Sequence, residues 1–477
     1  MRTGNEYLAA LDDDRRVYLD GERVRGIAKH EAFAPIANTI AELIDLGARR
    51  AQEAEETEHP IYRIPRSREE LRAFREAAQA WARHTHGWVG RSPDHVAAFL
   101  SAFAAHPDVF TREDRDYGAN VRAYQRKVAQ EQLYLSYAII PPQVSRASTA
   151  HDWDGELVQA GVAEERADGI VIRGAQMLAT GGAIADEILV SCIKPLTKED
   201  AQFAVSFAVP VGAEGLKLYC RRAYAPSATS SYDYPLSTRY DETDALLVFE
   251  DVFIPWERVF VYKDVDGLRR QFFDTGAHVF GNWQAQIRFT VKLQFLLGIA
   301  RKVAAVNGVD KFPGVVEKLG ELAGLASTVE SAMLAAEYTA EPDDQGLWRP
   351  GARAVYGAMG LQAEIYPRVL AILRDLVGGG VLQVPSSVAD LRNPETRADI
   401  DRYMYSPNVP AEERLKLFKL AWDAVGSEFA GRHHQYEMFY AGAPFVVKGY
   451  AFRNYDFSEP LAELDSFLSG YSPESAD

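Results

Sequence analysis

Three positions in this sequence place a charged or titratable side chain close to the start of a helix. Arg91 stands just before a helix cap, His95 lies in the first turn that follows, and His278 lies at the start of a later helix. An arginine can bind an anionic oxygen through its planar fork of N–H groups, and a histidine can exchange a proton near neutral pH. Both residue types also occur at helix starts as solvated, capping or packing residues. The spacing alone therefore leaves their role open.

The cysteine count excludes several other kinds of site. Only Cys192 and Cys220 occur in the 477 residues. Two cysteines do not make a disulfide framework, and they cannot supply three or four thiolates to a metal ion or an iron–sulfur cluster. No GxGxxG motif opens a strand–turn–helix unit, so the sequence predicts no nicotinamide site of its own.

Composition and charge are those of an ordinary globular protein without a polyanionic partner. The hydrophobic share is 47%, the charged share is 25%, and the formal net charge is -16. This charge argues against a nucleic-acid surface or an anionic membrane as partner. The polar N-terminus lacks the apolar core of a signal peptide, and no apolar run approaches the roughly 20 residues that span a bilayer. We therefore expect a cytoplasmic protein.

Changes in hydrophobic period predict three domains. Residues 1–136 have mainly helical periodicity, with helices expected at 34–50, 67–84, 92–106 and 120–135. Residues 137–265 consist of short β-branched and aromatic runs separated by turns, which is typical of strands. Residues 266–477 return to long amphipathic helices, expected at 282–307, 315–340, 351–377 and 411–429. The expected architecture is a helical domain, a small β domain and a helical bundle.

Several segments make the family of this chain recognisable. The order of domains resembles the α+β architecture of the acyl-CoA dehydrogenases, but order alone is weak evidence of function. Sharper matches, spread in order along the chain, resemble the 4-hydroxyphenylacetate 3-hydroxylase family. They are EYLAALDDDRRVYLDGERV at 6–24, GWVGRSPD at 87–94, AIIPPQVSR at 138–146, SYDYPLSTRYDETDALLVFEDVFIPWE at 231–257 and GSEFAGRHHQYEMFYAG at 426–442.

The resemblance implies an activity, cofactors and partners. Members of this family are two-component monooxygenases that hydroxylate a phenol beside its OH group. They take reduced FAD (FADH2) from a separate NAD(P)H:flavin reductase and form a C4a-hydroperoxide with O2. The family is usually a homotetramer that holds FAD in a groove between the β domain and the helices. A separate reductase agrees with the absence of a nicotinamide motif.

The resemblance also implies catalytic positions, with one departure. The family places an arginine, a tyrosine and a histidine around the phenol oxygen. Arg91 matches the arginine, but His95 stands at the tyrosine position and Tyr137 at the histidine position. The exchange either keeps the same donors and acceptors in a mirrored arrangement or marks a different substrate. We favour a different substrate, because His and Tyr place their polar atoms at different depths. His278 resembles a histidine base of related chlorophenol hydroxylases.

Cofactor and substrate contacts are implied in the same way. Positions matching the family's flavin contacts are Gln143, Ser145, Arg146, Thr180, Tyr440, Ala441 and Gly442. The family's specificity loop corresponds to Cys192, Ile193 and Lys194, where arylacetate enzymes have small hydroxyl residues. The His95/Tyr137 exchange and the different loop residues both argue against 4-hydroxyphenylacetate itself as the substrate. A tyrosine-like, coumarate-like or halogenated phenol of secondary metabolism, free or tethered to a carrier protein, fits as well.

Three other functions compete with a phenol hydroxylase. The 4-hydroxybutyryl-CoA dehydratase branch of this architecture needs three cysteines and a histidine for its cluster, so the cysteine count excludes it. An acyl-CoA dehydrogenase-like flavin oxidoreductase remains the main alternative, and it would purify yellow with tightly held FAD. A non-catalytic flavin-binding protein is disfavoured by Arg91, Gln143 and Thr180.

Overall fold

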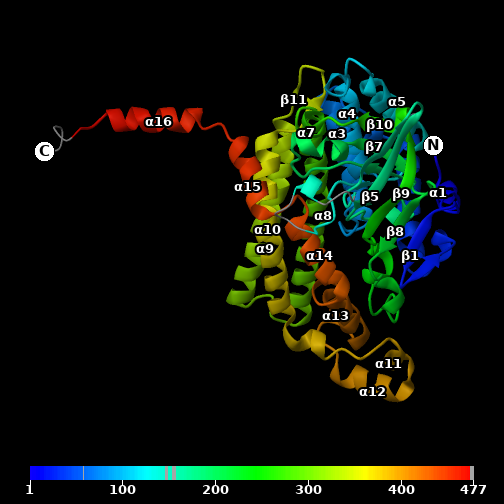
Figure 1. Ribbon diagram of the computed structural model, residues 1–477. Helices are drawn as coiled ribbons and strands as arrows, with labels where there is room; N and C mark the ends of the chain where they lie inside the picture. The colour runs from blue at the N-terminus through cyan, green and yellow to red at the C-terminus, as the bar shows by residue number, and fades with distance from the viewer. Residues whose placement is uncertain (57, 145–148, 153–156, 473–477) are drawn as a thin grey trace.

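Helices from both ends of the chain pack around a β layer built mainly from its middle (Figure 1). The computed structural model describes residues 1–56, 58–144, 149–152 and 157–472. Ser145 and Arg146, two of the predicted flavin contacts, lie outside the described residues. The domain boundaries after residues 136 and 265 stay a prediction.

The helices of the N-terminal part largely follow the sequence prediction. They are α1 (Gly4–Ala10), α2 (Ala34–Glu53), α3 (Arg68–His84), α4 (Asp94–Ala105) and α5 (Tyr117–Glu131). The hydroxyl of Ser67 caps α3 by accepting a hydrogen bond from the Glu70 N–H. Helix α4 is buried on every side and packs on α8 and on strand β3 (Leu135–Ala138). Because α4 carries His95 and β3 carries Tyr137, this packing brings two of the predicted phenol-binding residues together.

The β layer contains two main sheets. The strand order of the first is β2-β1-β8-β9-β5-β4, and that of the second is β10-β7-β6-β3. Their bounds are β1 (Arg16–Leu19), β2 (Glu22–Val24), β4 (Gly161–Arg166), β5 (Gly169–Gln176), β6 (Glu187–Val190), β7 (Ser206–Pro210), β8 (Leu216–Cys220), β9 (Ala245–Pro255) and β10 (Val259–Val261).

One hairpin in the first sheet departs from the expected helical N-terminus. Strands β1 and β2 are joined by Asp20 and Gly21, which have φ angles of 52° and 82°. An Asp-Gly pair with positive φ is the turn that matches the twist of a two-stranded hairpin. Strand β1 then pairs in parallel with β8, so the first 24 residues contribute to the β layer.

The C-terminal part is a bundle around one central helix. Its long helices are α7 (Val265–Phe273), α8 (Ala277–Val306), α9 (Pro313–Tyr338), α10 (Ala352–Val377), α13 (Ala411–Val425) and α14 (Glu428–Phe439). The first seventeen residues of α8 are buried around its whole circumference and include charged side chains, so α8 is a core helix. The helix expected at 411–429 ends at Val425, and Ser427 caps the new helix α14.

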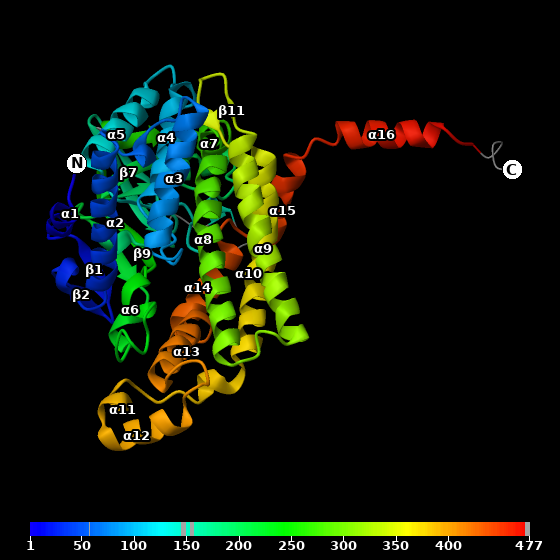
Figure 2. The same cartoon turned by 180° about the vertical axis from the view of Figure 1, so that it is seen from behind.

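Helix α6 (Ser237–Tyr240) packs against α2 in the N-terminal part. The other α-helices and strands of the C-terminal part are β11 (Glu341–Pro342), β12 (Trp348–Arg349), α11 (Ala389–Arg392), α12 (Pro394–Tyr403), α15 (Pro444–Arg453) and α16 (Ser458–Ser469). Helix α16 projects away from the rest of the chain in both views (Figures 1 and 2). No helix in the described part of the chain has the length and apolar character needed to traverse a lipid bilayer.

Candidate active site

Arg91 is buried, and its backbone is fixed by the β side of the molecule. The N–H groups of Gly90 and Arg91 each donate to one oxygen of the Glu242 carboxylate, both at 2.7 Å. The Tyr134 hydroxyl donates to the Arg91 carbonyl at 2.9 Å. Only 9% of Arg91 is exposed. Arg91 is therefore a buried cation with a fixed backbone rather than a solvated surface arginine.

His95 lies directly against the guanidinium of Arg91. The Gln284 amide nitrogen donates to Asp94 at 2.8 Å, so the amide oxygen faces His95 and accepts from Nδ1 at 3.1 Å. The other ring nitrogen, Nε2, then carries a lone pair and accepts from Arg91 Nη1 at 2.6 Å. Burial, and next the positive charge of Arg91, hold the pKa of His95 well below its usual range. His95 is thus a neutral hydrogen-bond acceptor.

Tyrosine rings surround the guanidinium of Arg91. Its central carbon lies 4.6 Å from the ring centre of Tyr440, 5.0 Å from that of Tyr137 and 5.5 Å from that of Tyr436. The Tyr137 ring also lies 5.2 Å from the His95 ring, and the Tyr440 hydroxyl lies 3.3 Å from His95 Nδ1. The π faces favour a cation, and their bulk keeps water away. Arg91, His95, Tyr137 and Tyr440, all predicted site residues, therefore lie together.

Thr180 follows strand β5, and its side chain is held by a second set of charged residues. Its hydroxyl donates to Asp244 at 2.6 Å, and the Arg221 and Arg432 guanidiniums hold Asp244 on its other sides. Burial would raise the pKa of Asp244, but Arg432 and Arg221 hold it well below its usual range. With its proton committed to Asp244, the Thr180 oxygen can still accept a hydrogen bond. The next residue, Gly181, packs against the Tyr134 hydroxyl that contacts Arg91.

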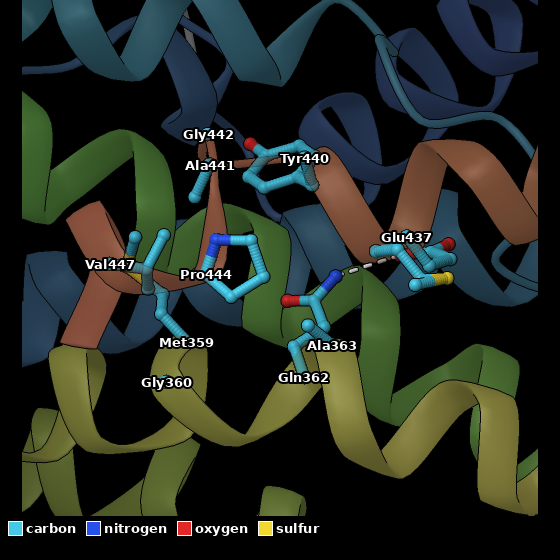
Figure 3. Close-up of a pocket in the computed structure, with 11 residues that line it drawn as sticks. Met359, Gly360, Gln362, Ala363, Glu437, Tyr440, Ala441, Gly442, Pro444 and Val447 are labelled. Carbon is cyan, nitrogen blue, oxygen red and sulfur yellow. Dashed lines mark hydrogen bonds between the residues drawn. The ribbon is translucent and has the colours of Figure 1, made fainter.

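A small pocket opens beside Tyr440, between helix α10 and the turn that follows α14 (Figure 3). Tyr440, Ala441 and Gly442 lie along one side of it, and Met359 and Gln362 of α10 lie along the other. Gly442 has a φ of 105°, a backbone conformation that favours glycine. The absence of side chains beyond Cβ at Ala441 and Gly442 leaves their backbone accessible from the pocket.

Comparisons with known proteins settle the family. The family models described as 4-hydroxyphenylacetate 3-hydroxylase N terminal and C terminal match residues 3–261 and 268–469. The chain belongs to the 4-hydroxyphenylacetate 3-hydroxylase family. This membership confirms the predicted family, the acyl-CoA dehydrogenase-like fold and the enzyme class, an aromatic monooxygenase of the two-component type.

Individual relatives are similar over nearly the whole chain. The 4-hydroxyphenylacetate 3-monooxygenase oxygenase component of Pseudomonas aeruginosa is 35% identical, covering 94% of this chain and 88% of the relative. A Streptomyces globisporus monooxygenase acting on a (3S)-3-amino-3-(3-chloro-4-hydroxyphenyl)propanoyl group on a peptidyl carrier protein is 36% identical, covering 92% and 85%. A crystal structure of an oxygenase component complexed with FAD and 4-hydroxyphenylacetate has a TM-score of 0.93 and 32% identity, covering 98% and 99%.

The hydroxylase family's predicted cofactor, FAD, is the one that this solved relative binds, and the residues present here fit it. Leu178 and Val144 are 52% and 57% exposed although both are apolar. A backbone bridge between Ile140 and Met177 places their two segments side by side. Exposed apolar side chains on these two segments, which lead to Thr180, suit a flat ring system that carries N–H groups. Gln143, in the same segment as Val144, is also exposed.

The predicted specificity loop of this hydroxylase follows strand β6. Cys192 is buried within the loop, where its sulfur accepts from the Gln159 amide at 3.3 Å and donates to the Lys194 carbonyl at 3.6 Å. Burial raises the pKa of Cys192 to about 11. Cys192 therefore holds the shape of the loop, and Ile193 and Lys194 are the partly exposed residues beside it.

His278 lies in a different environment from Arg91. Its Nδ1 is 2.9 Å from the Tyr356 hydroxyl, and its ring packs on Phe273, Tyr356 and Tyr450. Gly281, the next residue toward Arg91 on this face of α8, packs on Phe99. Among the described residues, the structure does not bring His278 into contact with Arg91, His95 or Tyr137.

The buried state of His278 predicts a pH-dependent stability. Burial lowers its pKa to about 4, so between pH 6.5 and 4 the unfolded chain binds a proton that the folded chain does not. Stability then falls with acidification by about 1.4 kcal/mol per pH unit from this group, and it is unaffected above pH 6.5. The variant His278→Gln should lose less of its thermal midpoint between pH 7.5 and 5 than the wild type.

Sequence reasoning missed two groups at this site. Gln284 orients His95 from helix α8, and Tyr436 packs on Arg91 one turn before Tyr440. The i, i+4 spacing of Tyr436 and Tyr440 in the GSEFAGRHHQYEMFYAG segment was a usable signal, since it puts both rings on one helix face. No local signal marks Gln284 within the long apolar pattern of α8.

Proposed function

We propose that this chain hydroxylates a para-substituted phenol at the carbon beside its OH group, using O2 and reduced FAD supplied by a separate flavin reductase. The observation that carries the proposal is the Arg91–His95 pair at 2.6 Å, enclosed by Tyr137 and Tyr440. A permanent cation beside a neutral imidazole and phenol hydroxyls is suited to an aromatic alcohol. The exchange of His and Tyr relative to the family supports a substrate other than 4-hydroxyphenylacetate.

Residues of this chain account for three requirements of the reaction. Arg91 stabilises negative charge on the phenol oxygen, which makes the neighbouring ring carbon more nucleophilic. The Tyr440 hydroxyl fixes the orientation of that oxygen, and His95, whose Nε2 accepts from Arg91, fixes the guanidinium that faces it. The rings of Phe99, Tyr137 and Tyr440 exclude water from the site. Bound FAD supplies, together with O2, the electrophilic oxygen atom.

Three segments of the described chain are proposed to hold FAD. Thr180, with its hydroxyl proton given to Asp244, accepts from an N–H group of the flavin ring. Gln143 contacts the cofactor from the segment that the Ile140–Met177 bridge places beside the Thr180 segment, and the Tyr440–Gly442 turn contacts it from the helical bundle. Ser145 and Arg146 are expected to contribute on the strength of the family resemblance alone, because they lie outside the described residues. Ile193 and Lys194 face the variable end of the substrate.

The activity can be tested directly. Purified protein is supplied with FAD, NADH and an independent flavin reductase, and then with a panel of phenols that includes 4-hydroxyphenylacetate, tyrosine, coumarate and 4-nitrophenol. A catechol product formed in excess of hydrogen peroxide supports the proposal. Only peroxide from every phenol, together with oxidation of an acyl thioester, would favour the acyl-CoA dehydrogenase-like alternative.

Matched tyrosine variants test which hydroxyl meets the substrate. Tyr440 reaches His95, whereas the buried Tyr436 hydroxyl has no hydrogen-bond partner among the described residues. Tyr440→Phe should raise the KM for the phenol about fivefold, since one hydrogen bond contributes about 1 kcal/mol. Tyr436→Phe keeps the ring on Arg91 and should leave KM unchanged. Equal effects of both variants on KM would contradict this assignment.

A homotetramer in the cytoplasm is our proposal for the assembly. Four large apolar residues of α16 stand exposed: Leu461 at 54%, Leu464 at 50%, Phe467 at 70% and Leu468 at 47%. The outer face of α9 is uncharged over Gly320, Gly324, Ser327, Ser331, Leu334 and Tyr338. Apolar and small-residue faces of this kind are suited to helix packing between copies of one chain. Truncation after Asn454 should lower the number of subunits per particle, calculated from the mass measured by light scattering, and an unchanged number would count against α16 as a contact.

A further inference from the structure

A cluster of buried charges lies directly behind the Arg91 group. Arg288 and Lys292 of α8 and Glu437 of α14 have side-chain exposures of 1%, 0% and 0%. The two Arg288 nitrogens bind the two Glu437 oxygens at 2.6 and 2.8 Å, and Lys292 adds a contact of 2.9 Å. The Gln362 amide of α10 donates to Glu437 at 2.8 Å (Figure 3). One carboxylate therefore joins three helices.

The same cluster holds the chain segment that leads to Arg91. Arg288 Nη1 also donates to the Gly87 carbonyl at 3.0 Å. The Lys292 ammonium lies 4.1 Å from the Trp88 ring centre, and the Lys292 backbone packs against Gly87. Gly87 has a φ of 75° and no room for a Cβ. The turn before Arg91 is thus seated on α8 by the residues that bind Glu437.

Glu437 also fixes the tyrosines that face Arg91. It follows Tyr436 directly and lies one helical turn before Tyr440. Since α14 ends at Phe439, Glu437 is in its last turn, close to the point where Tyr440 leaves the helix. Any rotation of this turn against α8 would move the Tyr440 ring relative to Arg91.

We propose that Glu437 is a positioning residue for phenol binding: by joining α8, α10 and α14, it sets the place of Tyr440 against Arg91 and His95. This inference rests on the proposed function, because it assigns a role to residues behind the same phenol site. Glu437 touches neither substrate nor cofactor in this role. It acts through the geometry of Tyr440 and of the 87–91 turn.

The charges of the cluster predict different effects for variants of Lys292 and of Glu437. Burial would raise the pKa of Glu437, but Arg288 and Lys292 lower it to about 2, so Glu437 is ionised. Burial lowers the pKa of Lys292 to about 7. In Lys292→Met, Arg288 and Gln362 still contact the two oxygens of Glu437, so the interactions that connect α8, α10 and α14 remain. Glu437→Gln removes the carboxylate that Arg288 and Lys292 share, and so disrupts the interactions that connect the three helices.

The first measurement needs no flavin. 4-Nitrophenol is titrated into the flavin-free protein, and its phenolate absorbance reports both binding and ionisation of the bound phenol beside Arg91. Glu437→Gln is expected to weaken binding at least about tenfold, a change of about 1.4 kcal/mol in binding free energy. Lys292→Met should have a much smaller effect. The control Lys419→Met removes another buried lysine, 9% exposed at its side chain, that pairs with Asp233 and contacts the Ser386 carbonyl outside this cluster, and it should leave binding unchanged.

The second measurement uses turnover with reduced FAD. A misplacement of about 1 Å behind a reacting centre lowers turnover by up to about 100-fold, so Glu437→Gln should lower kcat and release a larger share of hydrogen peroxide. Wild-type binding and coupling in a folded Glu437→Gln variant would overturn the inference. If Lys292→Met lost as much kcat and coupling as Glu437→Gln, the inference would also be overturned, because the loss would then come from removing a buried charge and not from separating the three helices.

A less disruptive variant covers the case in which Glu437→Gln does not fold. Gln362→Met keeps both ion pairs of Glu437 and removes its α10 contact, together with the hydrogen bond that Gln362 accepts from Gln286 at 2.8 Å. It should weaken 4-nitrophenol binding and raise the peroxide share in the same direction, though less strongly, and an unchanged profile would overturn the inference. A wild-type protein that hydroxylates no phenol would instead refute the proposed function, so the two failures are distinguishable.

Discussion

Replacing Arg91 by methionine is expected to lower kcat/KM for phenol hydroxylation by about 10²–10³-fold, the loss found when one preorganised donor to a developing oxyanion is removed. Arg91 is the cation at the centre of the tyrosine rings, and its backbone is fixed by Glu242 and Tyr134. Methionine keeps most of the volume but supplies no charge. The phenol then stays protonated and its ring is less nucleophilic, so O2 and reduced FAD should be consumed mainly as hydrogen peroxide.

The Arg91 prediction has a graded control. Arg91→Lys keeps the charge but not the planar fork, so it should fall between the wild type and the methionine variant. Arg222→Met removes an exposed arginine whose ion pair with Glu428 spans 3.5 Å, and it should change neither rate nor coupling. The measurement is product and peroxide per flavin oxidised, at a saturating reductase level. An Arg91→Met enzyme with normal coupling would refute the role of Arg91.

Local sequence patterns predicted those parts of the fold that depend on local interactions. Helices α2, α3, α9 and α10 begin and end within a few residues of the predicted positions, because caps and hydrophobic period are both local. The β1–β2 hairpin was missed although its Asp20-Gly21 turn is a local signal. The flanking strands are only three or four residues long, too short for a period of two to stand out.

The candidate site shows the same division. Arg91, His95, Tyr137 and Tyr440 were found through family motifs, and the structure places them together. The pairing of His95 with Gln284 joins residues separated by 189 positions, and it depends on the rotation of α8 about its axis. Nearly every position of α8 around Gln284 is buried, so hydropathy cannot indicate which side chain faces α4. Such contacts follow only from the packed structure.

The second large effect concerns His95, for which catalytic base and hydrogen-bond partner are competing roles. A general base near neutral pH needs a pKa close to the working pH. Burial and the adjacent Arg91 hold the pKa of His95 well below that range. Transfer of the phenol proton to His95 would also place two cations in contact in a site that excludes water. We therefore predict that His95 orients Arg91 and the phenol oxygen and does not take up the proton.

The variant His95→Gln separates these roles. Glutamine can accept from Arg91 and donate toward Gln284, but it cannot be protonated and has a different reach. We expect kcat/KM to fall about 10²-fold from misplacement of the reacting oxygen, while the pH dependence of kcat/KM keeps its wild-type shape. In both enzymes the acidic limb should follow the phenol, shifting to lower pH for a more acidic substrate such as 4-nitrophenol. Disappearance of the acidic limb in His95→Gln would instead identify His95 as the base, and Arg91 would then act on a phenolate that His95 generates.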